Sequence, residues 1–129
     1  SDGLSDFETG PQFFNPDMRH SALLIRDNQL YVFFSQAGQT PEGILLSSIE
    51  LTDDWQEWTA SEPIEVLRPE LDYEGANLPL EPSRRGYIDV PVHQLRDPAI
   101  YQEGDRTYLL YSVAGESGIA IAEIRFGNR

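Results

Sequence analysis

The chain has 129 residues, of which 40% are hydrophobic and 11% aromatic. This composition provides one modest hydrophobic core and excludes a disordered chain. The formal net charge of −13 argues against nucleic-acid and membrane partners, because phosphate backbones and anionic lipid headgroups would repel it. The chain has no cysteine, which excludes disulfides, zinc–thiolate sites and a cysteine nucleophile. Residues 1–12 lack the basic and apolar regions of a signal peptide, and we expect a soluble chain, cytoplasmic or secreted.

Residues 1–18 are rich in turn formers and are predicted to form an N-terminal arm. Its large apolar residues are Phe7, Phe13 and Phe14. Because edge strands are normally covered, we expect residues from about 4 to 14, anchored by these phenylalanines, to lie against the last strand of the chain, in the same or a partner molecule.

Four segments between residues 19 and 68 have strand character. Residues 21–25 and 30–35 are separated by charged and turn-forming residues, a pattern typical of a hairpin. In residues 30–35 the apolar side chains alternate onto both faces, so we expect this strand to be covered on both sides. Residues 44–51 are the third strand, and the prolines of residues 62–69 suit an edge strand. We expect no helix.

A loop over residues 69–95 precedes a second, incomplete set of strands. The loop is proline-rich, and a connection this long is usually functional or disordered. Three strands are predicted after it, at residues 98–102, 106–112 and 118–126. Residues 96–129 therefore lack the fourth strand that residues 19–68 contain.

The second set of strands repeats the first in sequence. Residues 19–51 align with residues 96–126 at an offset of 77 residues, with a two-residue gap after Gly38 and its counterpart Gly115. The matched identities include Arg19 with Arg96, Ala22 with Ala99, Tyr31 with Tyr108, Ser35 with Ser112, and Ile44 with Ile119. Such repeats are typical of architectures in which one unit cannot bury its own apolar faces and stacks on a neighbour. We therefore predict a single domain of two stacked units.

The second unit resembles the blades of five-bladed β-propeller glycosidases, such as glycoside hydrolase families 43 and 32. The resemblance rests on an Asp-Pro that opens a strand, on "YLLYS" and "GIAIAEI", and on "SSIELTDDWQEW" at the end of the first unit; it spans roughly residues 19–126. It implies an all-β fold of propeller-type blades, each a four-stranded antiparallel sheet, with about two blades in this chain. It also implies a carbohydrate-active protein. A non-catalytic glycan-binding module and a structural, self-assembling module remain alternatives.

The resemblance suggests Asp97 and Glu74 as catalytic residues. Glycoside hydrolysis needs two carboxyl groups flanking the scissile bond. Asp97 in "RDP" matches the aspartate that tunes or stabilises the reaction, and Glu74 in "YEGA" resembles the acid, although it precedes Asp97 in the chain. The alternatives are a turn aspartate and a solvated loop glutamate. His20 occupies the position of Asp97 in the first unit, so that unit lacks the carboxylate.

The predicted substrate-binding residues are Arg96, His20, Arg84 and His93. His20 would donate to a sugar hydroxyl, or would instead be a satisfied histidine near an inner strand. Arg96 would clamp a hydroxyl or carboxylate, or instead pair with a neighbouring acid. Arg84 and Arg85, with Asp89 and His93, lie in the loop before Asp97, where they would line the same opening; a surface pair of arginines also needs no function.

The remaining acidic and aromatic side chains of interest have either a structural role or a role in sugar stacking. Glu116 is expected to face water, and Tyr31, Tyr108, Trp55 and Trp58 would form either a sugar-stacking platform or, for the tyrosines above all, core. We predict no metal and no cofactor.

We further predict a homo-oligomer, most simply a two-fold dimer, because two stacked units leave apolar end faces. Strands 30–35 or 106–112 should contribute to the interface. Carbohydrate is the expected ligand, with little or no hydrolysis by this chain alone.

Overall fold

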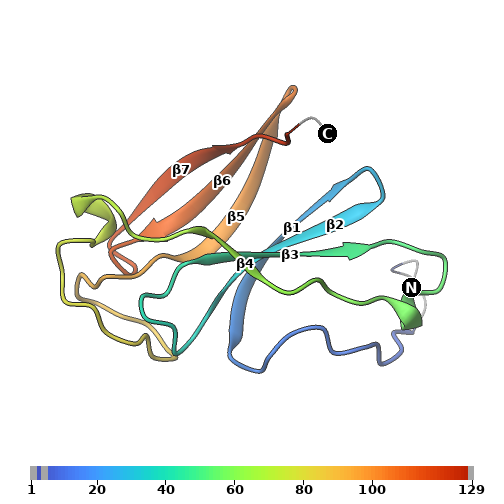
Figure 1. Cartoon of the computed structure of the whole chain (residues 1–129), viewed down its shortest axis with the longest axis horizontal. Helices are drawn as coiled ribbons and strands as arrows, with labels where there is room; N and C mark the ends of the chain where they lie inside the picture. Colours follow the sequence, from blue (N-terminus) through green and yellow to red (C-terminus); the bar gives the residue numbers. More distant parts are fainter. Residues whose placement is uncertain (1–2, 4–5, 128–129) are drawn as a thin grey trace.

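The computed structural model describes residue 3 and residues 6–127, which form two antiparallel β-sheets joined by a long loop (Figure 1). The first sheet has the order β1–β2–β3–β4 and comprises β1 (Met18–Arg26), β2 (Gln29–Gln36), β3 (Ile44–Glu50) and β4 (Ile64–Leu67). The second has the order β5–β6–β7 and comprises β5 (Arg96–Glu103), β6 (Arg106–Val113) and β7 (Gly118–Ile124). The predicted all-β class is confirmed. Within the described residues, helical structure is limited to two single 3₁₀ turns, η1 (Trp55–Glu57) and η2 (Asp72–Glu74).

The hairpin β1–β2 turns through Asp27 and Asn28, both of which have positive φ. Two consecutive left-handed residues match the right-handed twist of the flanking strands, and Asp and Asn tolerate that conformation better than most residues. The turn sets a register in which Ala22 faces Phe33 on the neighbouring strand. Because side chains alternate, this register gives the sheet two distinct apolar faces.

One face of the first sheet packs against the second sheet. The buried residues of this inter-sheet core are Ala22, Leu24, Phe33, Ile44, Leu95, Leu109, Tyr111 and Val113. The two sheets contact each other along β1 and β5, and they diverge towards β4 and β7 (Figure 1). The starts of β1 and β5 therefore lie next to each other, which places the repeat-equivalent ends of the two units together.

The other face of the first sheet is covered by the N-terminal arm. Phe14 packs on Phe34 with ring centroids 5.0 Å apart, and Phe13 packs on the same cluster. The expectation that the arm covers β7 is wrong within this chain, because the arm covers apolar side chains of β2 and β3 that would otherwise face water. Phe7 is 81% exposed and anchors nothing, and residues 4 and 5 of the expected contact lie outside the described residues.

Strand β2 is buried on both faces, as its sequence predicts. Phe33 belongs to the inter-sheet core, whereas Val32 and Phe34 lie under the arm. Since both faces of β2 are used within the chain, residues 106–112 are the strand, of the two named, that remains available for an interface between copies. β4 lies at the edge of its sheet, in agreement with its prolines.

Candidate functional site

The first strand of each sheet begins with the same irregularity. The register of β1 with β2 shifts between Arg19 and Ala22, and that of β5 with β6 shifts at the equivalent positions of the repeat. His20 and Asp97 sit in these bulges with φ of 44° and 51°. Non-glycine residues with positive φ are uncommon and concentrate at functional sites, although turns also use them. The bulge re-aims both side chains at the start of the strand.

His20 and Asp97 contact each other across the two units. The Nδ1–H of His20 donates to Oδ1 of Asp97, and the Ser112 hydroxyl donates to Oδ2 at 3.2 Å. The His20 side chain is 64% exposed and that of Asp97 29%, so the pair is open to solvent. The structure therefore brings together two of the predicted site residues from repeat-equivalent positions.

A polar cavity of about 630 Å³ opens over this pair. Its lining residues are Met18, Arg19, His20, Arg85, Gly86, Tyr87, Asp97 and Glu116. The long loop contributes Arg85, whose guanidinium donates to the Pro16 carbonyl at 2.7 Å, and Tyr87, which is 84% exposed. Sequence analysis placed Arg84 and Arg85 beside the opening, chose Arg84 as the substrate-binding residue and did not select Tyr87.

Beneath the cavity lies a buried ion cluster centred on Glu42, which is fully buried. Arg19 donates to both of its carboxylate oxygens, at 2.9 and 3.0 Å, and Arg96 lies 3.8 Å from one of them. Two repeat-equivalent arginines thus converge on one carboxylate. The cluster joins the residues that directly precede His20 and Asp97.

Arg96 supports the site from below. It is 2% exposed, and its guanidinium donates to Gln94, to the Gly86 carbonyl at 3.2 Å and to Glu116 at 3.0 Å. These contacts fill the donor positions that the sequence-based prediction assigned to substrate. Glu116 is exposed, as expected, and its carboxylate also lines the cavity and pairs with Arg96.

Glu74 lies away from the cavity. It is 5% exposed and accepts hydrogen bonds from the Leu71 amide at 3.1 Å and from the Tyr111 hydroxyl at 3.2 Å. Burial, reinforced by Glu74, raises the pKa of Tyr111 to about 12. The structure does not bring Glu74 to Asp97, and the alternative of a solvated loop charge is also wrong. Glu74 holds the start of the long loop against β6.

The other two predicted substrate-binding residues do not line the cavity. The exposed Arg84 contributes only its carbonyl, which accepts from Arg19 at 3.1 Å. His93 Nδ1 lies 3.0 Å from the Leu78 carbonyl oxygen, so this contact links two parts of the long loop. No group of three or more His, Asp or Glu side chains within residues 6–127 is placed to hold a metal ion.

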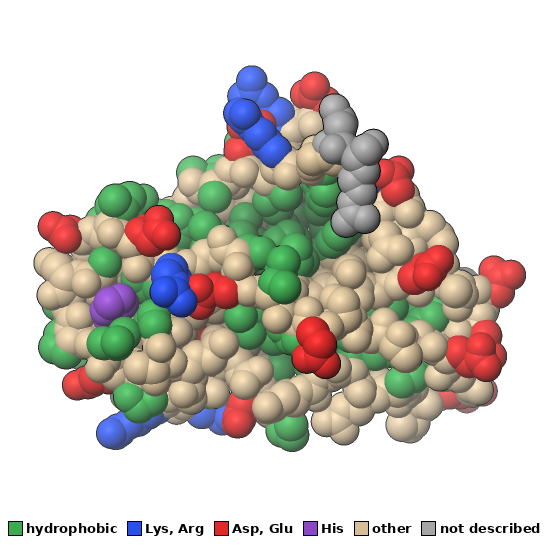
Figure 2. Space-filling view, viewed as in Figure 1, with side chains coloured by type: hydrophobic (Ala, Val, Ile, Leu, Met, Phe, Trp, Pro, Cys, Tyr) green, Lys and Arg blue, Asp and Glu red, His purple; other side chains and the backbone are tan. Residues whose placement is uncertain are grey.

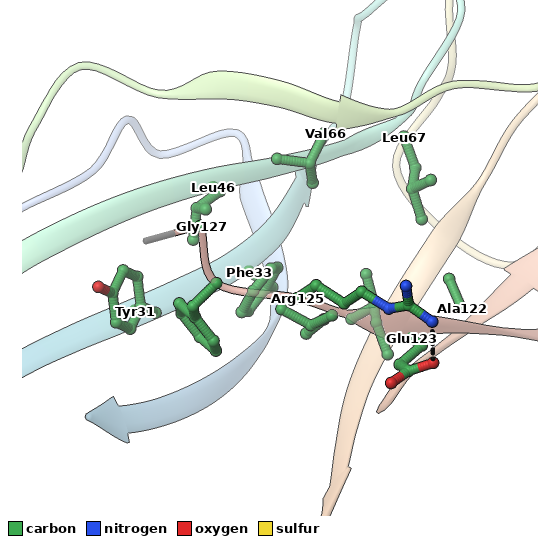
Figure 3. A pocket seen from close by; sticks show the side chains of 12 residues that line it. Tyr31, Phe33, Leu46, Val66, Leu67, Ala122, Glu123, Arg125 and Gly127 are labelled. Carbon is green, nitrogen blue, oxygen red and sulfur yellow. Dashed lines mark hydrogen bonds and ion pairs between the residues drawn. The ribbon is translucent and has the colours of Figure 1, made fainter. Parts of the chain in front are cut away.

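A second, apolar cavity of about 380 Å³ lies where the sheets diverge (Figure 3). Figure 2 shows hydrophobic side chains gathered in this hollow. Residues 125–127, which follow β7, enter it, and Phe126 packs on Tyr31 with ring centroids 5.3 Å apart. The Arg26 guanidinium lies 4.0 Å from the centroid of Phe126. This part of the chain partly fills the space between the sheets, and most of the side chains that line the hollow are apolar.

Comparison with known proteins identifies one relative. An uncharacterized protein of Acanthamoeba polyphaga mimivirus is 47% identical over 108 residues, which make up 83% of this chain and 30% of the viral protein. The chain thus spans less than a third of the length of that relative. No protein-family model and no solved structure matches the chain. Within the described residues, no helix is long and apolar enough to cross a membrane.

Proposed function

We propose that the two sheets are blades of a propeller-type protein and that the cavity over His20 and Asp97 binds carbohydrate. The repeated bulges and the fan of two sheets support the architecture. The length of the mimivirus relative supports it too. A 108-residue match that covers 30% of that protein implies about 360 residues, which is room for between four and five units at the spacing of this repeat.

The observation that carries the ligand proposal is the His20–Asp97 pair at the mouth of a polar cavity. Sugar hydroxyls both donate and accept, so a sugar site needs both kinds of group within a few ångströms. Here the carboxylates of Asp97 and Glu116 accept, and the exposed Arg85 donates. The cavity volume lies in the range of small-molecule sites.

Hydrolysis by this chain alone is expected to be weak or absent. A glycosidase needs two free carboxyl groups, about 5–5.5 Å apart for retention or about 6.5–9.5 Å apart for inversion. Both oxygens of Asp97 are engaged, Glu116 is paired with Arg96, and Glu74 is buried elsewhere. These contacts favour a glycan-binding role over catalysis.

The test is calorimetric titration of the chain with a panel of neutral and acidic oligosaccharides, comparing wild type with Asp97→Asn and His20→Asn. Asparagine tolerates positive φ, so both variants keep the bulge while changing the pair. We expect each to weaken binding at least about tenfold, the loss of one good hydrogen bond to a charged group. Asp105→Asn, on the exposed β5–β6 turn, is the matched control. Affinity unchanged in both pair variants would remove this cavity as the site.

The same variants also test catalysis. Aryl-glycoside turnover that Asp97→Asn abolishes and Asp105→Asn retains would show an enzyme and overturn the binding role.

A further inference from the structure

The outer face of the second sheet is the one sheet face of the described chain that no other segment covers. Its apolar side chains are Ala99 and Tyr101 on β5, Tyr108 and Leu110 on β6, and Ile119 and Ile121 on β7. The first sheet packs against the second sheet on one side, and the arm covers the β2 and β3 part of its other side, where Leu23 and Ile25 on β1 stay exposed. The opposite side of the second sheet faces the inter-sheet core. Ile119 and Ile121 remain 76% and 59% exposed.

The repeat shows what kind of surface this outer face is. Its six residues align with Ala22, Leu24, Tyr31, Phe33, Ile44 and Leu46 of the first unit. All six counterparts belong to the inter-sheet core or pack against it. The same positions are thus buried by a β-sheet in one unit and open in the other. A partner for the outer face is therefore expected to be another apolar β-sheet.

Among residues 6–127, no second sheet face is placed to pack against the outer face. When this chain is in solution, the apolar sheet available to cover the outer face is the outer face of another copy. The geometry points to a two-fold dimer in which the outer faces of two copies pack together, with the axis running along β6, the central strand of the sheet (Figure 1). An isologous interface of this kind uses the same residues on both sides.

The outer face is self-complementary about this axis. The register places Ala99, Leu110 and Ile121 in one row across the three strands. A two-fold axis along β6 lays β5 of one copy over β7 of the other, so the small Ala99 faces the large Ile121 of the second copy at both ends of the row. Leu110 meets its own counterpart on the axis. Alternation of small and large side chains is how facing layers interdigitate.

The neighbouring row is arranged in the same way. Tyr101 and Tyr108 stack with ring centroids 6.3 Å apart, and Glu123 follows them on β7. The axis therefore brings Tyr101 near Glu123 of the second copy, where a phenol can donate to a carboxylate. The net charge of −13 opposes association, so added salt should strengthen the dimer by screening.

The test is the solution mass by light scattering across a micromolar concentration series. We expect twice the 14.6 kDa chain mass for wild type. Ile121→Glu should raise the dissociation constant of the dimer about 100-fold or more, because it buries a charge against an apolar face. Ile64→Glu is the matched control, because Ile64 on edge strand β4 is 60% exposed. It should stay dimeric.

A size exchange tests the axis itself. Ala99→Ile places two large side chains opposite each other, and Ile121→Ala places two small ones. Each should weaken the dimer about tenfold, and the double variant should recover most of the loss. A wild-type monomer throughout the series, a dimer indifferent to Ile121→Glu, or a double variant no better than either single one would each overturn the proposal.

Discussion

Replacing Glu42 with glutamine should be among the most damaging single changes to the stability of this protein. Glu42 is fully buried and is the carboxylate on which Arg19 and Arg96 converge. Glutamine keeps the shape but removes the charge, so a buried arginine loses its counter-ion. Breaking one partner of a buried pair costs about 3–5 kcal/mol. Because Glu116 still pairs with Arg96, we expect a value near the lower end, about 3 kcal/mol.

Urea unfolding followed by the fluorescence of Trp55 and Trp58 measures this loss. With an m-value of roughly 2 kcal/mol/M, Glu42→Gln should lower the urea midpoint by about 1.5 M. Glu65→Gln changes the net charge equally at an exposed pair on β4 and should leave the midpoint within error. The double variant Arg19→Met with Glu42→Leu should be milder than Glu42→Gln, because it buries no unpaired charge at position 19. A Glu42→Gln midpoint equal to that of the Glu65→Gln control would refute the reasoning.

Two further predictions concern the anchoring of the long loop. Since the folded-state pKa of Tyr111 is raised to about 12, wild-type stability should be lost as pH rises from 10 to 12, by up to roughly 2–3 kcal/mol. Urea midpoints of Tyr111→Phe should lack this decline; parallel declines in both proteins would contradict the assignment. Gly75 has φ of +94°, and a Cβ there would lie 2.3 Å from the Val92 carbonyl oxygen. Gly75→Ala should therefore lower the melting temperature several times more than Gly104→Ala, where φ is +60° but the space is open. Equal falls in melting temperature would show that the positive φ causes the loss and that the contact with Val92 adds nothing.

The strands could be read from the sequence because their signals are local. Period-two alternation placed apolar side chains on both faces of residues 30–35, and the structure buries both. The position of the arm could not be read in the same way. Phe13 and Phe14 indicate only that the arm must pack against an apolar surface. The choice between the open edge of β7 and the uncovered face of β2 depends on the apolar surface area that each presents, and these surfaces exist only after the sheets have formed.

The site residues that could be predicted from the sequence are those that the alignment of the two units pairs with each other. Alignment of the two units picks out Asp97 and its counterpart His20, and the structure places them in contact. Glu42 falls in the loop where the alignment has a gap, so nothing in the sequence marks it as the centre of a buried cluster. Glu74 was selected for a motif, but its environment is set by Tyr111 on a strand far along the chain.

His20 and Asp97 occupy equivalent positions of the two units and contact each other, so these two residues cannot be identical aspartates without repulsion. In the second unit the Ser112 hydroxyl donates to Asp97. Its counterpart Ser35 is fully buried, and its hydroxyl has no hydrogen-bond partner among the described residues. An aspartate at position 20 would offer Ser35 an acceptor, but it would also press a second carboxylate against Asp97, and like charges at that distance disfavour each other. Histidine avoids this repulsion and donates to Asp97 instead, at the cost of an unpaired serine hydroxyl. Strict repetition is therefore incompatible with a close contact between equivalent positions, and the departure from it falls at the polar cavity.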